Sequence, residues 1–528
     1  MTVQHPVAGA ALGIFLALLG IYVATSPGRV DILDGQYRYE VARNWLDQGR
    51  PVVQDPYLIP LGLAVRTPGA VYSAYNAAPS VAAMPLMLFS RALPGHRAER
   101  DRFFFTMTGP IFGAALGGLL VVAYAMLGVS LPRSVAWALA ICLATAWWPG
   151  STTVFDQNQH AVWLFAAVLL AWESARRARV WPAALGGLAG AVLLNYQENY
   201  ALLLPLAGLA VASTGPSSPS GETRVGSAID RGSLTRYAAF GVASATGLAA
   251  FAGFNFLRFG EPLVPGRYAD PILFALGHPV AALVGLSVSP GKSLFLYSPP
   301  LVLAALGARR LFARAPALSM AIAAVTVVHV LLIAQLAFFG GDWCWGPRYL
   351  LVLIPLWALA VPFAVSPARR WLAGVLVGAG LLVQLLAVSV DHQRFFFERD
   401  LAPHFWALDP WFYLGHSQLA ARVSELAEAV RAGVPAGARV FTSSPTGEVT
   451  YAPFGPPPPA PSAEWVRHFA VFYLPRPWPL WIGRLPEPLR PVEPWPWLAL
   501  SGALMAAGAT VTRRAVRSDR GAVGRAVE

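Results

Sequence analysis

Acidic side chains with the spacing of a proton-transfer site occur at two places beside long apolar runs. Asp31 and Asp34 follow the first apolar run, and Asp156 and His160 precede a later one. A carboxylate such as Asp34 can act as a general base. Side chains four residues apart share a helix face, so Asp156 and His160 can bind a metal or orient a hydroxyl group. Helix capping and hydration at a membrane interface explain the same residues, and both interpretations stay open.

Cations and aromatic rings gather in two further segments. One contains Arg267, Tyr297 and Lys292, the only lysine of the chain, and the other contains Arg348 near two tryptophans. Either cation can contact a phosphate. There are alternatives to phosphate binding. Lys292 can extend its ammonium to the membrane interface, and the tryptophans can belong to a belt of interfacial aromatic rings. The Gly-Lys-Ser at Lys292 is not a P-loop, because five residues separate the two preceding glycines where that motif has four.

The composition indicates a membrane protein. Of the 528 residues, 56% are hydrophobic and 12% charged, against about 45–50% and 25% in soluble domains. The net charge of +12 resides mainly in short arginine clusters, which are typical of cytoplasmic loops. These features exclude a soluble enzyme, a disordered chain and a nucleic-acid partner. The two cysteines form neither a disulfide framework nor a metal-binding pattern.

Apolar runs, together with the arginine clusters, predict about 12 transmembrane helices, since a crossing needs about 20 residues. The runs lie near 7–25, 104–127, 133–150, 160–173, 181–194, 200–213, 237–257, 293–307, 316–338, 349–365, 371–390 and 495–512. A run at 80–91 contains Pro85 and is interpreted as a re-entrant or surface helix. If it crossed, the cluster at 176–179 would lie outside, against the usual bias of basic loops toward the cytoplasm.

This topology predicts an all-α polytopic membrane protein. A periplasmic first loop carries juxtamembrane helices, including one over 41–49, and a small extracytoplasmic segment near the C-terminus contains a helical pattern at 419–431. The predicted units are a transmembrane catalytic module over 1–390, the extracytoplasmic segment 391–494, and a last transmembrane helix with a basic cytoplasmic tail over 495–528.

Four stretches resemble blocks of the GT-C glycosyltransferases, multi-pass enzymes that use polyprenyl- or dolichyl-phosphate sugars. The family includes protein O-mannosyltransferases and lipid A aminoarabinose transferases. The stretches are Asp34-Gly-Gln-Tyr37, Asn255-Phe-Leu-Arg-Phe-Gly-Glu-Pro262, Ser289-Pro-Gly-Lys-Ser-Leu-Phe-Leu-Tyr-Ser-Pro-Pro300 and Gly341-Asp-Trp-Cys-Trp-Gly-Pro-Arg-Tyr349. At the level of architecture the likeness covers about residues 7–390. Low lysine content and high Ala, Gly, Pro and Arg content indicate a GC-rich bacterial genome, hence a bacterial inner membrane.

The resemblance implies an inverting transfer of a sugar from a polyprenyl-phosphate carrier to an acceptor hydroxyl on the extracytoplasmic face. Asp34 matches the proposed catalytic base and Asp156 a second acidic site. The predicted substrate-binding residues are Tyr37, His160, Arg267, Lys292, Tyr297 and Arg348. Many members carry two adjacent acidic residues in the first loop, whereas Gly35 follows Asp34 here. The cofactor is therefore unknown, with a divalent metal as one option.

Two other functions fit the same helix pattern: a transporter or flippase of a lipid-linked saccharide, and a non-enzymatic envelope assembly protein that holds a partner through 391–494. A transporter is expected to place polar residues in mid-helix and to show inverted halves. Here the polar residues gather in loops and no repeat is found, which favours the enzyme. Its expected partners are the lipid-linked donor, membrane lipid and an acceptor of unknown class.

Overall fold

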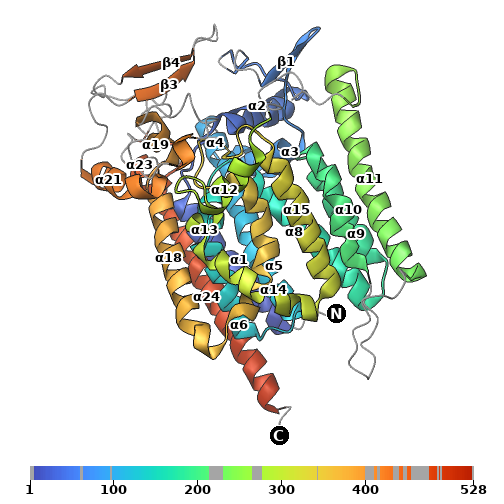
Figure 1. The fold of residues 1–528 in the computed structure, drawn as a ribbon. Helices are drawn as coiled ribbons and strands as arrows, with labels where there is room; N and C mark the ends of the chain where they lie inside the picture. The colour runs from blue at the N-terminus through green and yellow to red at the C-terminus, as the bar shows by residue number, and fades with distance from the viewer. Residues whose placement is uncertain are drawn as a thin grey trace.

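A computed structural model gives the structure of the chain. It describes residues 5–525 except 57, 60–62, 96–97, 213–229, 264–275, 342, 399–408, 413–414, 416, 432–438, 444–448, 454–474, 484–486 and 488–489. The described part is mostly helical. Long apolar helices run roughly side by side as a bundle (Figure 1).

The bundle is built from long helices joined by shorter helical pieces. The long ones are α1 (His5–Thr25), α5 (Thr108–Met126), α6 (Leu131–Ala144), α8 (Gln157–Arg177), α9 (Trp181–Leu194), α11 (Arg231–Phe259), α14 (Val302–Arg314), α15 (Pro316–Ala334), α18 (Arg370–Ser389) and α24 (Pro494–Arg525). The short ones are α7 (Trp147–Gly150), η1 (Glu198–Leu202), α10 (Leu204–Gly208), η2 (Leu209–Val211), α12 (Pro279–Val288), α13 (Leu294–Tyr297), η5 (Pro299–Leu301), η6 (Arg348–Leu353), α16 (Ile354–Ala358), α17 (Val361–Ala364) and η7 (Pro367–Arg369).

Five helical stretches are long and apolar enough to cross a membrane. They are His5–Thr25, Ala98–Met126, Arg231–Phe259, Pro316–Ala334 and Pro367–Ser389. Membrane-type helices are therefore confirmed for part of the predicted apolar runs, whereas the runs near 200–213, 293–307 and 349–365 contain short helical pieces in place of one long helix. About 12 crossings, and the side of the membrane that each loop faces, stay predictions.

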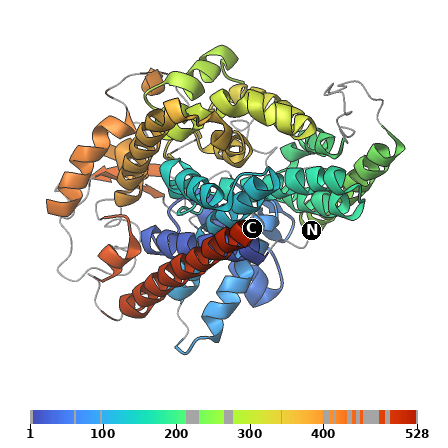
Figure 2. The ribbon, with the colours of Figure 1, turned by 90° about the horizontal axis from the view of Figure 1, so that it is seen from below.

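The first and last helices pack against each other along their length (Figure 2). Small residues permit this contact: a Cβ added at Gly13 would lie 2.8 Å from the carbonyl oxygen of Gly508, and one at Gly508 would lie 2.4 Å from the backbone nitrogen of Ala17. Close packing through small residues is a common way for membrane helices to associate. It joins the two ends of the chain into one bundle.

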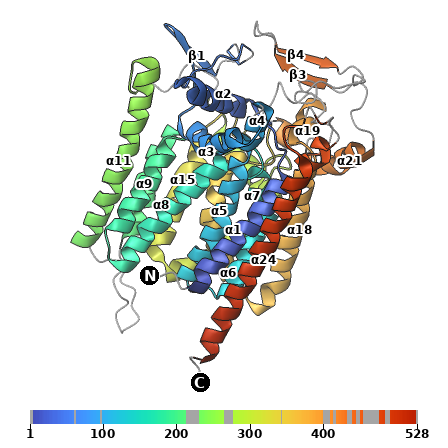
Figure 3. The same cartoon turned by 180° about the vertical axis from the view of Figure 1, so that it is seen from behind.

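Loop elements cover the end of the bundle opposite the two termini (Figures 1 and 3). They comprise α2 (Leu33–Gln48), β1 (Ala64–Thr67), β2 (Ala70–Ser73), α3 (Ala78–Ala92), α4 (Ala98–Thr106), α19 (His392–Glu398), α20 (Asp409–Phe412), α21 (Gln418–Arg431), β3 (Arg439–Ser443), β4 (Val449–Pro453) and α23 (Trp478–Ile482). The described residues of the polar stretches at 26–101 and 391–494 thus lie at one end, and the candidate site is built there.

Predictions for these loops are met in part. The helical patterns at 41–49 and 419–431 are confirmed as α2 and α21, although α2 begins earlier, at Leu33. The run at 80–91 lies in α3, whose 15 residues are fewer than the roughly 20 of a crossing helix. Two antiparallel hairpins, β1–β2 and β3–β4, depart from the all-α expectation. Pro68-Gly69 forms the turn of the first, with Gly69 at a φ of +88°.

Candidate functional site

The first turn of α2 places Asp34 at the edge of the site. The N-cap of α2 is Ile32, and no side chain caps it by a hydrogen bond, so neither Asp31 nor Asp34 serves as a cap. The Asp34 side chain is 19% exposed, and its Oδ1 accepts a hydrogen bond of 2.6 Å from the Tyr75 hydroxyl. Asp34 is therefore a positioned carboxylate that a substrate can still reach.

Arg38, one turn after Asp34 on α2, lies between the two predicted acidic residues. Its Nη2 is 3.8 Å from Oδ2 of Asp34 and 2.9 Å from Oδ2 of Asp156. The guanidinium also lies over the Tyr75 ring, with 4.7 Å from its Cζ to the ring centroid. A single buried cation thus joins Asp34 to Asp156, which the sequence places far apart.

Asp156 precedes α8 and is almost fully buried. It occupies the N-cap position, yet its side chain makes no capping hydrogen bond. Its Oδ2 lies 3.2 Å from Nε2 of His160, and Nδ1 of His160 lies 3.0 Å from the Tyr200 hydroxyl. The predicted Asp156–His160 pair is therefore confirmed as a contact on one helix face, with Asp156 turned toward Arg38.

Arg348 provides a second guanidinium group near Oδ2 of Asp34. It begins η6, after a turn in which Gly341 and Gly346 have positive φ angles. Its Nη1 is 3.6 Å from Oδ2 of Asp34, and its guanidinium lies over the Phe155 ring at 4.0 Å. Because two guanidinium groups flank one partly exposed carboxylate, an anion beside Asp34 would meet two forked hydrogen-bond donors.

The first hairpin delivers Tyr75, which lies two residues after β2. Arg258, at the end of α11, donates to the carbonyl oxygens of Ser73 and Tyr75 at 2.7 and 2.8 Å. Arg258 belongs to the stretch Asn255–Pro262, so this stretch fixes the backbone that carries the Tyr75 hydroxyl. We refer to Asp34, Arg38, Tyr75, Asp156 and Arg348 as the Asp34 cluster.

Of the other predicted substrate-binding residues, Tyr37 contacts this cluster through its ring, whose centroid lies 6.1 Å from that of Tyr75. The Tyr37 hydroxyl donates to the carbonyl oxygen of Leu58 and faces a hydrophobic core. Tyr297 is fully buried, with its ring 5.0 Å from that of Trp345. Arg267 lies outside the described residues.

Lys292 is buried under the turn that leads to Arg348. Its Nζ donates to the carbonyl oxygens of Cys344 and Gly346 at 3.0 and 3.1 Å, and it lies over the Trp411 ring. The alternative of a lysine extended to the interface is therefore wrong. Lys292 instead stabilises the backbone from which Arg348 projects.

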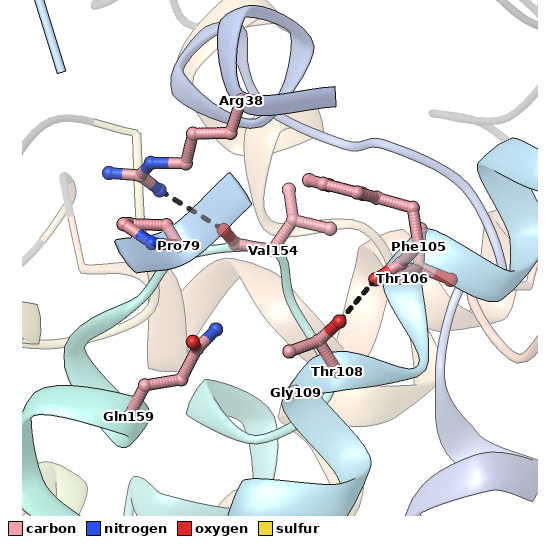
Figure 4. A pocket seen from close by; sticks show the side chains of 8 residues that line it. All are labelled: Arg38, Pro79, Phe105, Thr106, Thr108, Gly109, Val154 and Gln159. Carbon is pink, nitrogen blue, oxygen red and sulfur yellow. Dashed lines mark hydrogen bonds between the residues drawn. The ribbon is translucent and has the colours of Figure 1, made fainter. Parts of the chain in front are cut away.

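A small cavity lies behind Arg38 (Figure 4). Its lining includes Thr106, Thr108, Val154 and Gln159 besides Arg38. The Arg38 guanidinium donates to the carbonyl oxygen of Val154 at 3.3 Å. Arg38 is therefore anchored to the 152–156 loop by a backbone acceptor as well as by a carboxylate.

The described residues do not fit a divalent metal at this place. Among them, no three His, Cys, Asp or Glu side chains are grouped so as to hold a metal ion. The two nearest carboxylates, Asp34 and Asp156, both face the Arg38 guanidinium, which occupies the position that a shared cation would need. The chemistry considered below uses side chains alone.

A second group of charges lies behind the Asp34 cluster. Asp31 pairs with Arg476 at 3.6 Å, and Arg29 pairs with Asp391; we refer to these four residues as the Asp31 cluster. Burial raises the pKa of Asp31 to about 6, with the Asp391 carboxylate acting in the same direction and the two arginines opposing it. Burial also acts to raise the pKa of Asp391, but Arg29, His392 and Arg476 together hold it below its usual value.

Sequence reasoning missed two members of the Asp34 cluster. Arg38 stands four residues after Asp34, the spacing of one helix face, but the predicted helix begins at residue 41, whereas α2 begins at Leu33. Tyr75 had no local signal, since its contact with Asp34 depends on the tertiary placement of the first hairpin. The predicted Tyr37 differs from Arg38 by one position. Its ring packs against that of Tyr75, but its hydroxyl donates to the carbonyl oxygen of Leu58 and not to Asp34.

Comparisons with known proteins add no relatives. No protein-family model and no curated protein matches this chain.

Proposed function

We propose that the protein is a glycosyltransferase that moves a sugar from a polyprenyl-phosphate carrier to an acceptor hydroxyl. The observation that carries the proposal is the environment of Asp34. This carboxylate is 19% exposed, accepts a hydrogen bond from Tyr75 and lies between the guanidinium groups of Arg38 and Arg348. A base and two phosphate-type donors therefore face one place at the end of an apolar bundle, where a lipid-linked substrate can present its head group.

In the proposed step, Asp34 acts as the catalytic base. The acceptor oxygen forms a bond to the anomeric carbon of the sugar while the bond from that carbon to the phosphate oxygen breaks. The hydroxyl proton passes to the Asp34 carboxylate, and the electron pair of the broken bond stays on the polyprenyl phosphate. A single base with no covalent intermediate corresponds to inversion at the anomeric carbon, and general-base catalysis typically contributes about 10²–10⁴-fold to the rate.

The departing phosphate gains negative charge in this step. Arg348 is suited to stabilise that charge, since a guanidinium binds phosphate oxygens through two parallel hydrogen bonds. Arg38 contributes a second positive charge and keeps its contact with Asp156. Stabilisation of developing charge by groups that are already in place is often the largest contribution to catalysis. We place the reaction at the extracytoplasmic face of a bacterial inner membrane, following the arginine clusters of the sequence.

The test is transfer from a panel of radiolabelled polyprenyl-phosphate sugars in membranes that contain the wild-type chain, Asp34→Asn or Asp47→Asn. Asp47 is a matched control because it lies on the same helix and is 44% exposed. We expect transfer from one donor, a loss of about 100-fold or more in Asp34→Asn, and wild-type transfer in Asp47→Asn. A chelator is expected to leave the rate unchanged.

Equal behaviour of the wild type and Asp34→Asn on every donor would contradict the proposal. Movement of the intact lipid-linked saccharide across the membrane would then be the function to measure.

A further inference from the structure

Arg476 belongs to the segment 391–494 but lies inside the first-loop region. Its backbone nitrogen donates to the carbonyl oxygen of Ser389 at 2.8 Å, next to a bridge between Val390 and Pro475. Two residues later, the Trp478 backbone nitrogen donates to the carbonyl oxygen of Ser26 at 2.8 Å. The chain around Arg476 is thus attached both to the end of α18 and to the end of α1.

The Arg476 side chain joins two loops that are distant in sequence. Its Nη1 donates to the Thr152 hydroxyl at 2.8 Å and its Nη2 to the Thr152 carbonyl oxygen at 3.2 Å. The same Nη2 lies 3.6 Å from Oδ2 of Asp31. The planar fork of the guanidinium presents donors to a hydroxyl, a carbonyl oxygen and a carboxylate in one fixed geometry.

Asp31 continues this chain of contacts toward the Asp34 cluster. Its Oδ1 accepts a hydrogen bond from the Val154 backbone nitrogen at 3.3 Å. On the other side of Val154, the carbonyl oxygen accepts from Arg38. A Cβ added at Gly35 would lie 2.3 Å from a methyl carbon of Val154, so the first turn of α2 rests directly on this loop.

The 152–156 loop is therefore held from two sides. Arg476 contacts Thr152, and Asp31 accepts from the Val154 backbone nitrogen. Arg38 contacts the Val154 carbonyl oxygen and the Asp156 carboxylate. Burying charged groups carries a large desolvation cost, and apolar residues of similar size often stabilise a protein at least as well. Stability alone does not explain this network, whereas fixing a loop that carries Asp156 does.

We propose that Arg476 is a positioning residue of the Asp34 cluster, through which the C-terminal extracytoplasmic segment holds the 152–156 loop and so sets the positions of Asp156 and Arg38. The inference rests on the proposed function for its effect on activity. Its structural part does not.

The test compares Arg476→Lys, Arg476→Met and Thr152→Val in the full-length protein. Arg490→Met is the matched control, because Arg490 lies in the same segment with its side chain 25% exposed. The measurements are the unfolding temperature, hydrogen exchange of peptides that cover residues 151–156, and kcat and KM of sugar transfer. A lysine keeps a charge opposite Asp31 but lacks the second donor arm for Thr152.

We expect faster exchange over residues 151–156 in all three test variants. We also expect Arg476→Lys to lower kcat about ten-fold with little change in KM, at an unfolding temperature near that of the wild type. Thr152→Val removes the hydroxyl that accepts from Arg476 and donates to the carbonyl oxygen of Pro149. It leaves every charge of the network in place, so it covers the case in which Arg476→Met fails to fold. Arg490→Met is expected to match the wild type in every measurement.

Unchanged exchange over residues 151–156 in Arg476→Lys and Thr152→Val would overturn the inference. Faster exchange with wild-type kcat would overturn it as well, because the loop would then move without affecting the reaction. Failure of the wild type to transfer any sugar, with faster exchange in the variants, would instead refute the proposed function and support the link between Arg476 and the loop.

Discussion

Asp31 and Asp34 are three positions apart in the sequence, but the clusters named after them differ in burial and in the partners of each carboxylate. Asp34 is 19% exposed and borders a place that a substrate can reach, whereas the Asp31 side chain is fully buried. Asp34 has a tyrosine hydroxyl and two arginines around it, and Asp31 has Arg476 and the Val154 backbone. The difference indicates that the Asp34 carboxylate can react with a substrate, whereas the Asp31 carboxylate stabilises the surrounding loops.

Burial gives the two clusters different energetic consequences. Removing one partner of a buried ion pair leaves the other charge without compensation and costs about 3–5 kcal/mol. Neutralising a partly exposed carboxylate such as Asp34 costs less, because water reaches that carboxylate and weakens its ion pairs. Variants that remove a charge from the Asp31 cluster are therefore expected to affect stability first, and variants of the Asp34 cluster to affect activity first.

The largest expected effect is that of Asp391→Asn on stability. Asp391 is fully buried against Arg29, so we expect the free energy of unfolding to fall by about 3–5 kcal/mol. Asp34→Asn is expected to change it by less than about 1 kcal/mol. Chemical or thermal unfolding of the purified protein in detergent measures both. The double variant Arg29→Met/Asp391→Leu is expected to recover most of the loss, and an Asp391→Asn protein as stable as the wild type would contradict the comparison.

Much of the bundle could be predicted from the sequence, because apolar runs of helical length determine where membrane-type helices form. The first hairpin also had a local signal, Pro68-Gly69 between two short β-prone stretches. The contact of Tyr75 with Asp34 had no local signal in the sequence, since it depends on how Arg258 holds the end of β2. Local spacing found Asp156 with His160, but only tertiary packing brings Arg348 to Asp34.

The Asp31 cluster was beyond sequence reasoning for a similar reason. Arg476 follows a Pro-rich stretch that carries no helical or strand pattern, and its partner Asp31 lies more than 400 positions earlier. An ion pair between two irregular loops produces no regular residue spacing in either loop, so the sequence does not predict it. The sequence pointed to 391–494 only as a region of uncertain role, and the buried contacts of Arg476 connect it to the first loop.

Two groups of the buried network, His392 and Asp31, are expected to change the free energy of unfolding with pH in opposite directions. Burial lowers the pKa of His392 to about 3, with Arg476, Arg422 and Lys292 acting in the same direction and Asp391 opposing it. The unfolded chain therefore binds a proton on His392 below about pH 6.5 that the folded chain does not bind. The free energy of unfolding then falls on acidification by up to about 1.4 kcal/mol per pH unit.

Asp31 acts with the opposite sign. Because its folded pKa is raised to about 6, the folded chain holds a proton between about pH 6 and pH 4 that the unfolded chain releases, and acidification adds stability there. We expect His392→Asn to gain stability relative to the wild type from about pH 6.5 to pH 4.5, and Asp31→Asn to lose it below about pH 6. Melting curves across this range test both, and parallel curves for the three proteins would contradict the assignment.

A smaller effect is expected when the Asp34 cluster loses one hydrogen bond. Tyr75→Phe removes the donor to Oδ1 of Asp34, and a hydrogen bond to a charged group contributes about 1.5–3 kcal/mol. Arg38 and Arg348 remain in place, so we expect kcat of transfer to fall about ten-fold and the free energy of unfolding to fall by no more than about 1.5–3 kcal/mol. Tyr72→Phe, in the same hairpin, is the control. Equal kcat values for Tyr75→Phe and Tyr72→Phe would show that the Tyr75 hydroxyl has no role in the reaction.

The smallest effect is expected at an ion pair on the surface of the same loop region. Arg91 contacts Asp47, which is 44% exposed, at 2.6 Å, and Asp101, which is 2% exposed, at 3.0 Å. Asp47→Asn is expected to change the free energy of unfolding by less than about 0.5 kcal/mol. Asp101→Asn is expected to cost about 1.5–3 kcal/mol, because Asp101 also accepts a hydrogen bond from the buried Ser90 hydroxyl. Because both carboxylates contact Arg91, unfolding measurements on the two variants test whether burial, and not charge, determines the stability loss. Equal losses in the two variants would contradict the role given to burial.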